Sequence, residues 1–394
     1  MGDGVRYIGA AERRARLALR QRLAPEARAG SPEEVAGSLV ALHGTDPATV
    51  YLAVGARLAD AATTVPETER ALYTDRSLVR MHGMRHTVFV FPTDLTAVVH
   101  ASTGLAVAAR ERTSLLKDMA KAGAPDAAWL KEVEESALAA LTRRGQATAA
   151  ELAQDEPRLR EQFAYAAGKS YEGVHTVSTR LLRVLGVEGR VVRGRPLGSW
   201  TSSQFRWAVA PPHPELDVAE AQAALLGRWL TACGPATEDD LKWWTGWKVT
   251  DVRRALAAIG ARSVALDEGT GYVVDGDVEP VAGPAQPWAA LLPGLDPAAM
   301  GWRERDWYLA PELRPLLFDR SGNVGPTVWW DGRVVGGWAQ RLDGEIVWRV
   351  LVPSGVGREA EAAIGAEVQR LQGWLGTTKV TPRFRTPVEK ELAG

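Results

Sequence analysis

The side chains with the clearest chemical potential lie in one short run, LHGTDP, at residues 42–47. A neutral imidazole such as that of His43 can accept a proton from water near neutral pH, which is the task of a general base. Thr45 could orient the same water molecule, and Asp46 could stabilise a cation that develops beside it. The run also has a purely structural interpretation. In it, His43 is a polar residue at a helix end, and Asp46 caps the helix that Pro47 opens.

Basic residues are concentrated in particular stretches, although 47 Lys and Arg against 48 Asp and Glu give the whole chain a net charge of −1. Residues 176–210 hold six arginines and one acid, Glu188, and so carry a local net charge of +5. Clustered cations on helices and hairpins predict contacts with phosphate groups. The candidates for such contacts are Arg80, Arg85, His86, Arg180, Arg183, Arg193, Arg195, Lys248, Arg253 and Arg254. The alternative interpretation is that nearby acids neutralise these charges on ordinary solvated helix faces.

Arg193 and Arg195 stand shortly before Pro196, at a predicted hairpin with a turn-rich tip over residues 194–198. We expect both side chains to reach into a groove of a nucleic acid. Replacing both by alanine is then expected to reduce the slope of log binding constant against log salt concentration by about two.

The sequence contains no recognisable metal-binding or cofactor-binding motif. The remaining histidines lack the spacing to acids or cysteine that metal sites require; they are His82, His86, His100, His175 and His213. Cys233 is the single cysteine, which rules out a disulfide within the chain. Neither a Walker A sequence nor a GxGxxG run before a helix occurs. We therefore expect no metal and no cofactor.

The elements that must position the candidate residues repeat along the chain. An N-cap hydroxyl with an acid three residues later occurs three times, at Ser31/Glu34, Thr148/Glu151 and Thr237/Asp240. Further helices are predicted at 47–58, 174–185 and 249–259, each followed by a β-rich segment such as residues 87–91. Helix, helix, helix and hairpin is the order of elements in a winged helix.

The last quarter of the chain has a different pattern. Asp331-Gly332 and Asp343-Gly344 each separate two β-rich runs, which predicts successive hairpins in a small antiparallel barrel or sheet. We expect the tryptophans of these strands to pack in the core. Residues 359–374 are predicted to form one amphipathic helix. The chain is thus of the α+β class, with domains at 1–124, 125–212, 213–284 and 285–394.

Five segments in this order resemble the tandem winged-helix DNA glycosylases that include AlkZ and YcaQ. They are residues 42–47, 52–58, 80–87, 292–296 and 331–336, and the resemblance extends from about Ala11 to Pro382. It implies three tandem winged helices and a C-terminal antiparallel β-barrel, arranged in a C shape around double-stranded DNA. It also implies hydrolysis of the N-glycosidic bond of bulky alkylated purines, crosslinked ones included.

The chain departs from this family at residues 43–45, where characterised members carry Gln-x-Gln or Gln-x-Asp before the Asp-Pro. Two hypotheses follow. In the first, the protein is a monofunctional, metal-free glycosylase in which His43 and Thr45 flank the attacking water. In the second, it binds DNA without catalysis, as a lesion sensor, a toxin-resistance binder or a regulator. A protein-interaction scaffold is a third interpretation, which the near-zero net charge favours.

The partner expected from this interpretation is damaged duplex DNA. The N-terminal residues lack the apolar stretch of a signal peptide, and no apolar run approaches the roughly 18 residues of a membrane span. We expect a cytoplasmic, nucleoid-associated monomer.

Overall fold

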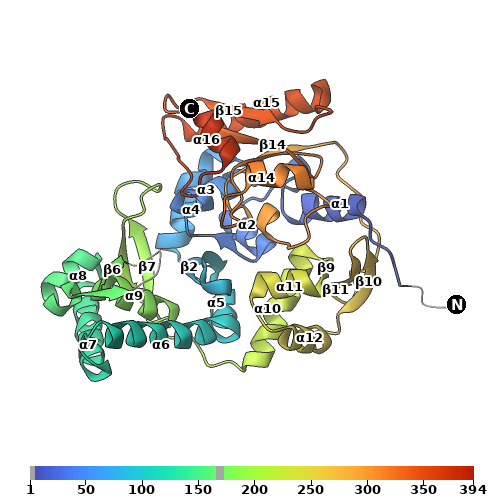
Figure 1. Cartoon of the computed structure of the whole chain (residues 1–394). Coiled ribbons are helices and arrows are strands. Elements are labelled where there is room, and N and C mark those ends of the chain that lie inside the picture. Colours follow the sequence, from blue (N-terminus) through green and yellow to red (C-terminus); the bar gives the residue numbers. More distant parts are fainter. Residues whose placement is uncertain (1–4, 166–172) are drawn as a thin grey trace.

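The computed structural model describes residues 5–165 and 173–394, in which helices alternate with short antiparallel strands (Figure 1). Three sheets in this part of the chain have three strands each. Their orders are β1-β3-β2, β4-β8-β7 and β10-β11-β9, so the last strand of each set lies between the other two. One order repeated three times agrees with the predicted repeat of three similar units, and the mixed α and β composition is confirmed.

The first unit carries the LHGTDP run between its second and third helices. Its elements are α1 (Ala10–Arg20), α2 (Pro32–Leu39), β1 (Leu42–His43), α3 (Pro47–Gly55), α4 (Thr64–Glu69), β2 (Leu78–His82) and β3 (Val88–Pro92). Ser31 caps α2 by accepting the Glu34 N–H at 3.2 Å. The Glu34 carboxylate reaches the N–H of Gly30 rather than that of Ser31, so the predicted capping box is incomplete.

The second unit follows a long connection through α5 (Thr96–Val99) and α6 (Leu105–Lys121). It contains α7 (Ala127–Arg144), β4 (Gln146–Ala147), α8 (Ala149–Asp155), β5 (Gln162–Tyr165), β6 (Gly173–Thr176), α9 (Val177–Val187), β7 (Val191–Pro196) and β8 (Phe205–Val209). The predicted capping box of Thr148 and Glu151 is confirmed. The predicted helix start at residue 174 is wrong, because residues 173–176 pair with β5 and Thr176 caps the helix.

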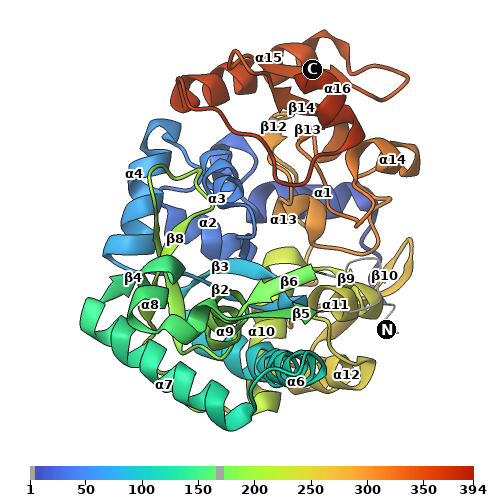
Figure 2. The ribbon, with the colours of Figure 1, turned by 60° about the vertical axis from the view of Figure 1, so that its left-hand side comes forward.

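The third unit lies on the side of the first unit that faces away from the second unit (Figures 1 and 2). It consists of α10 (Val218–Cys233), β9 (Ala236–Thr237), α11 (Glu238–Thr245), α12 (Val249–Ala258), β10 (Arg262–Leu266) and β11 (Gly269–Val273). Thr237 and Asp240 form the predicted capping box at the start of α11. Gly260 follows α12 with φ +61°, a left-handed conformation that suits glycine at a helix end.

The C-terminal sheet sits over the first unit (Figure 1). It has the order β12-β13-β14-β15, from β12 (Ala289–Leu292), β13 (Thr327–Trp330), β14 (Arg333–Gln340) and β15 (Ile346–Val350). The predicted barrel is wrong, since β12 and β15 do not pair in the described part of the chain. Instead, α15 (Gly357–Leu375) packs on β12 and α16 (Pro387–Ala393) packs on β14, so helices cover the open sheet. Small helices α13 (Pro297–Met300) and α14 (Arg314–Leu317) connect β12 to β13.

The predicted hairpins and tryptophan packing of this sheet are confirmed. Asp331 and Gly332 have φ of 45° and 77° between paired Trp330 and Arg333. The Trp329 side chain is fully buried and stacks on Tyr308 at 5.4 Å between ring centroids. The tryptophan strands therefore supply the core rather than an exposed stacking surface.

Two of the segments that carry the family resemblance meet in a buried ion pair. The guanidinium of Arg57 donates two hydrogen bonds to the carboxylate of Asp296, at 2.7 and 2.8 Å, and both side chains are 0% exposed. Arg57 also donates to the carbonyls of Gln21 and Ala53, each at 2.9 Å, and Asp296 caps α13. This pair therefore joins α1, α3 and the C-terminal region.

Across the described residues, the helices are too short or too polar to cross a membrane.

Candidate active site and nucleic-acid interface

His43 lies on β1, where strand pairing fixes its backbone. His43 pairs with Phe89 of β3, and the two rings meet edge to face at 5.3 Å between centroids. Gly44 donates its N–H to the carbonyl of Val88 at 2.8 Å, and a side chain at residue 44 would press on the β3 backbone. The N–H of Thr45 points at Nδ1 of His43 across 3.5 Å, the long limit for a hydrogen bond. Nε2 is therefore the ring nitrogen left for another partner.

Burial, with the positive charge of Arg85 adding to its effect, lowers the pKa of His43 to about 4. The imidazole is thus neutral at physiological pH and offers one donor and one acceptor. A glutamine amide, which the resemblance implies at this position, also has a donor and an acceptor.

Asp46 is buried at the start of α3, and hydrogen bonds engage both of its carboxylate oxygens. Oδ1 accepts the N–H of Ala48 at 3.1 Å, which confirms that Asp46 caps the helix. Oδ2 accepts the N–H of Arg383 at 2.9 Å. Asp46 thereby ties the segment that contains His43 and Thr45 to the C-terminal part of the chain.

Three arginines whose side chains face no carboxylate lie near one another, and two of them, Arg80 and Arg383, contact this segment. Arg80, on β2, donates to the carbonyl of Gly44 at 3.4 Å, while its Nε is buried without a partner. Burial, and then the positive charges of Arg80, Arg383 and Arg183, lower the pKa of Arg193 to about 10. Among the described residues, no Asp or Glu oxygen lies within 4.0 Å of the side chains of Arg80, Arg193 or Arg383. We call these three residues the basic cluster.

The turn between β2 and β3 places Arg85 and His86 against both neighbouring units. Their φ angles are 52° and 62°, which is uncommon for residues other than glycine. The guanidinium of Arg85 lies over the ring of Trp243 on α11, 4.1 Å from its centroid. Nδ1 of His86 lies 3.0 Å from Arg183 of α9 and 3.2 Å from Glu111 of α6. These two predicted DNA contacts thus join the three units.

Most of the other predicted phosphate contacts already face a carboxylate. The pairs and their distances are Arg180–Asp118 at 3.1 Å, Arg183–Glu111 at 3.8 Å, Arg195–Glu69 at 2.6 Å, Arg253–Glu238 at 2.9 Å and Arg254–Asp251 at 3.1 Å. Lys248 is exposed at the N-cap of α12 and has no salt bridge to a described residue. The structure therefore separates Arg80, Arg193 and Lys248, which have no acidic partner, from the paired arginines.

Two arginines near the site were missed by the sequence analysis. Arg383 reaches Asp46 from 337 residues away along the chain. Arg305 lies over the same Trp243 ring as Arg85, at 4.9 Å, and two of its nitrogens are buried without partners. No local sequence pattern marks either residue, because each joins the site through tertiary contacts.

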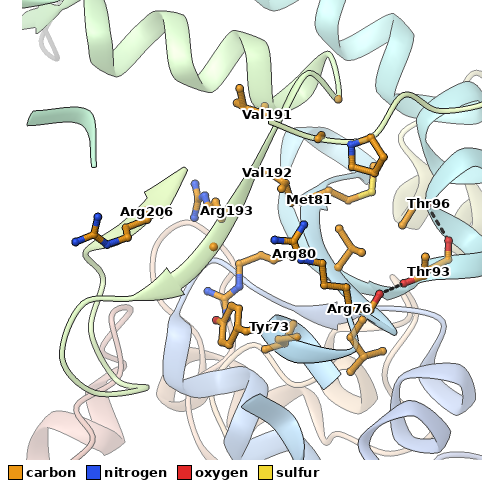
Figure 3. A pocket seen from close by; sticks show the side chains of 18 of the residues that line it. Tyr73, Arg76, Arg80, Met81, Thr93, Thr96, Val191, Val192, Arg193 and Arg206 are labelled. Atoms are coloured by element: carbon orange, nitrogen blue, oxygen red, sulfur yellow. Dashed lines mark hydrogen bonds between the residues drawn. The ribbon is translucent and has the colours of Figure 1, made fainter. Parts of the chain in front are cut away.

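A cleft of about 540 Å³ opens beside the basic cluster, between β2 of the first unit and β7 of the second (Figure 3). Arg80 and Arg193 both line it. His, Cys, Asp and Glu side chains within residues 5–165 and 173–394 form no group of three or more that could hold a metal ion.

All six histidines should make the fold sensitive to mild acid. Burial is the largest cause that lowers the pKa of each, to about 4 for His43 and about 3 for His82. The unfolded chain then binds protons first, at about pH 6.5. The free energy of unfolding therefore has its full value above about pH 6.5, and it falls as the pH drops towards 4. The expected loss is up to about 1.4 kcal/mol of unfolding free energy per pH unit for each of His43 and His82, and smaller for the four more exposed histidines.

Urea unfolding at several pH values between 7 and 5 measures this loss. The variant His82→Gln should show a shallower pH dependence than the wild type, whatever its stability at pH 7. His175→Gln, at a less buried position, is the matched control. A free energy of unfolding that stays constant down to about pH 4.5, where carboxylates begin to titrate, would contradict the prediction.

Comparison with known proteins identifies the family of the chain. The profile of the family described as DNA glycosylase AlkZ-like matches residues 36–374. The DNA glycosylase AlkZ of Streptomyces sahachiroi has a similar structure, with a TM-score of 0.72 and 21% sequence identity, over 96% of this chain and 99% of that one. No curated protein matches the chain. The family resemblance is confirmed: the chain belongs to the AlkZ-like DNA glycosylase family.

Proposed function

We propose that this protein is a DNA glycosylase that hydrolyses the N-glycosidic bond of bulky or cationic alkylated purines in duplex DNA, crosslinked purines included. One observation carries the proposal. A neutral, half-buried His43 lies one residue from Gly44, whose carbonyl accepts from Arg80 of the basic cluster, and the charges of this cluster face no carboxylate. Phosphate groups would satisfy these charges and hold a nucleotide next to His43.

The chemistry asked of the protein is modest because a cationic base is a good leaving group. The C1′–N bond breaks, and its electron pair neutralises the departing base. A water oxygen then bonds to the oxocarbenium-like C1′, and its proton leaves to His43 or to solvent. His43 and Thr45 would hold this water, as a glutamine amide could, by hydrogen bonding alone. Asp46 would keep the two residues in place and add negative charge near the sugar.

We further propose that each of the three helix–sheet units is a winged helix, in domains at 1–124, 125–212 and 213–284, followed by a C-terminal domain at 285–394. The repeated strand order supports this assignment, since a short strand pairs with the hairpin in every unit. A C-shaped arrangement of these domains would let a monomer hold duplex DNA without a partner subunit.

A DNA-binding protein without catalysis is the second candidate. It is favoured by the replacement of the family's glutamines by His43 and Thr45, and by the direction of Nδ1 towards the Thr45 N–H. Single-turnover release of N7-methylguanine from a methylated duplex, and then of a bulky adduct, tests the two candidates. Release supports the glycosylase. Intact duplex binding without release of either base supports the non-catalytic protein.

Arg193 and Arg195 should differ in their contribution to DNA binding, although they are two residues apart on β7. Arg193 faces no carboxylate, whereas Arg195 pairs with Glu69 and lies over Tyr73. Arg193→Met should weaken duplex binding and flatten the salt slope by about one. Arg195→Met should change the slope by much less, because Glu69 already neutralises its charge.

Duplex affinity measured at several salt concentrations gives these slopes. Arg349→Met is the matched control, since Arg349 is an exposed arginine paired with Glu391 on the C-terminal domain. If both β7 variants change the slope equally, the distinction between free and paired arginines is wrong.

A further inference from the structure

The cleft between β2 and β7 has walls that a contact with DNA phosphates does not need. It is lined by consecutive residues of both strands, and each strand lies at the edge of its sheet. The buried side chains of Leu72, Leu78 and Val191 supply apolar surface. An edge strand also leaves every second N–H and C=O without a strand partner, so backbone groups can contribute hydrogen bonds.

The charge of the cleft has one sign. Five arginines line it, at positions 76, 80, 193, 195 and 206, and no acidic residue does. Glu69 and Glu151 neutralise Arg195 and Arg206 from outside the lining. Arg76, Arg80 and Arg193 have no salt bridge to any residue in the described ranges. Arg80 on β2 and Arg193 on β7 are both labelled among the residues that line the cleft (Figure 3).

The surroundings of Arg80 and Arg193 suit an anion. Arg80 makes one long hydrogen bond, 3.4 Å to the carbonyl of Gly44, and its Nε is buried without a partner. Arg193 rests on the ring of Phe205, 4.5 Å from the centroid, and meets no carboxylate. Two half-buried cations held near each other repel, and a bound anion between them would remove that cost.

We propose that this cleft binds a small organic anion, with a largely apolar aromatic body and a carboxylate, sulfonate or phosphate at one end. A cleft of about 540 Å³ has the size of a site for one drug-sized molecule. The apolar walls take the body, and Arg80 and Arg193 take the anionic end. Arg80 also donates to the carbonyl of Gly44, which stands between His43 and Thr45 in the chain, but neither of these two residues lines the cleft. The site requires neither DNA nor catalysis.

Anilinonaphthalene sulfonate tests the proposal, because it combines an aromatic body with one anion and fluoresces in apolar surroundings. The probe is titrated into the full-length chain, and phenylnaphthylamine, which lacks the sulfonate, is titrated in parallel. We expect saturable binding of one sulfonate probe per chain. Arg80→Met and Arg193→Met should each weaken it about tenfold, as expected for the loss of a charge-assisted hydrogen bond. Binding of the neutral probe should stay within about twofold of wild type.

Two further variants keep the test independent of folding defects. Arg349→Met, on the C-terminal domain, should leave the affinities of both probes unchanged. Val192→Trp fills the cleft without removing an arginine and should abolish binding of both probes, while circular dichroism confirms that each variant is folded. The proposal is overturned if the arginine variants bind the sulfonate probe as the wild type does, or lose both probes equally. Full binding by folded Val192→Trp would also overturn it.

Discussion

His43→Ala should reduce the single-turnover rate of N7-alkylguanine release at least tenfold, which corresponds to about 1.4 kcal/mol of activation free energy. Alanine removes the polar group beside the attacking water and leaves the basic cluster intact. Duplex affinity should therefore stay close to that of the wild type while the rate falls. His43→Gln is the informative companion, because an amide keeps one donor and one acceptor at this position. We expect it to retain most of the activity.

The pH profile of release separates this histidine from an ordinary one. With the pKa of His43 at about 4, the ring stays neutral over the physiological range. The rate should therefore be level between about pH 6 and pH 8, and His43→Gln should show the same profile. An inflection near pH 6.5 in the wild type, absent from His43→Gln, would mean that the ring titrates as a solvent-exposed histidine does. An unchanged rate in His43→Ala would remove His43 from the reaction.

Asp296→Ala should lower the free energy of unfolding by about 3–5 kcal/mol, the usual cost of leaving one partner of a buried ion pair unpaired. The guanidinium of Arg57 would lose two hydrogen bonds in a site with no exposure to water. The N-cap of α13 would be lost as well. Urea unfolding followed by circular dichroism measures the loss.

The double variant Arg57→Met/Asp296→Ala provides the control for this ion pair. Removing both charges avoids an unpaired buried cation, so its loss should be clearly smaller than the sum of the two single losses. Additive losses would indicate that Arg57 and Asp296 stabilise the fold independently. Asp267→Ala, at an exposed turn of the third unit, should cost much less.

Local features of the fold were predictable because they depend on residues a few positions apart. Thr148 and Thr237 cap helices, and Asp331-Gly332 forms a tight hairpin turn, as their spacing indicates. The start of α9 was misplaced because residues 173–176 pair with a strand that the local pattern does not reveal. The barrel was wrong because hairpins specify neighbouring strands and do not specify whether the outer two meet.

The sequence by itself determined the repeated units, their caps and the family, because these depend on local spacing and on motifs in a fixed order. Only the tertiary structure decided which charges are free. Arg193 and Arg195 look alike in sequence, yet Glu69, 126 residues from Arg195, neutralises that side chain alone. Tertiary structure also decides the second partner of Asp46. Its Oδ2 accepts the backbone N–H of Arg383, which lies near the far end of the chain. Charge pairing acts through space over a few ångströms, so the fold determines the chemistry of each side chain.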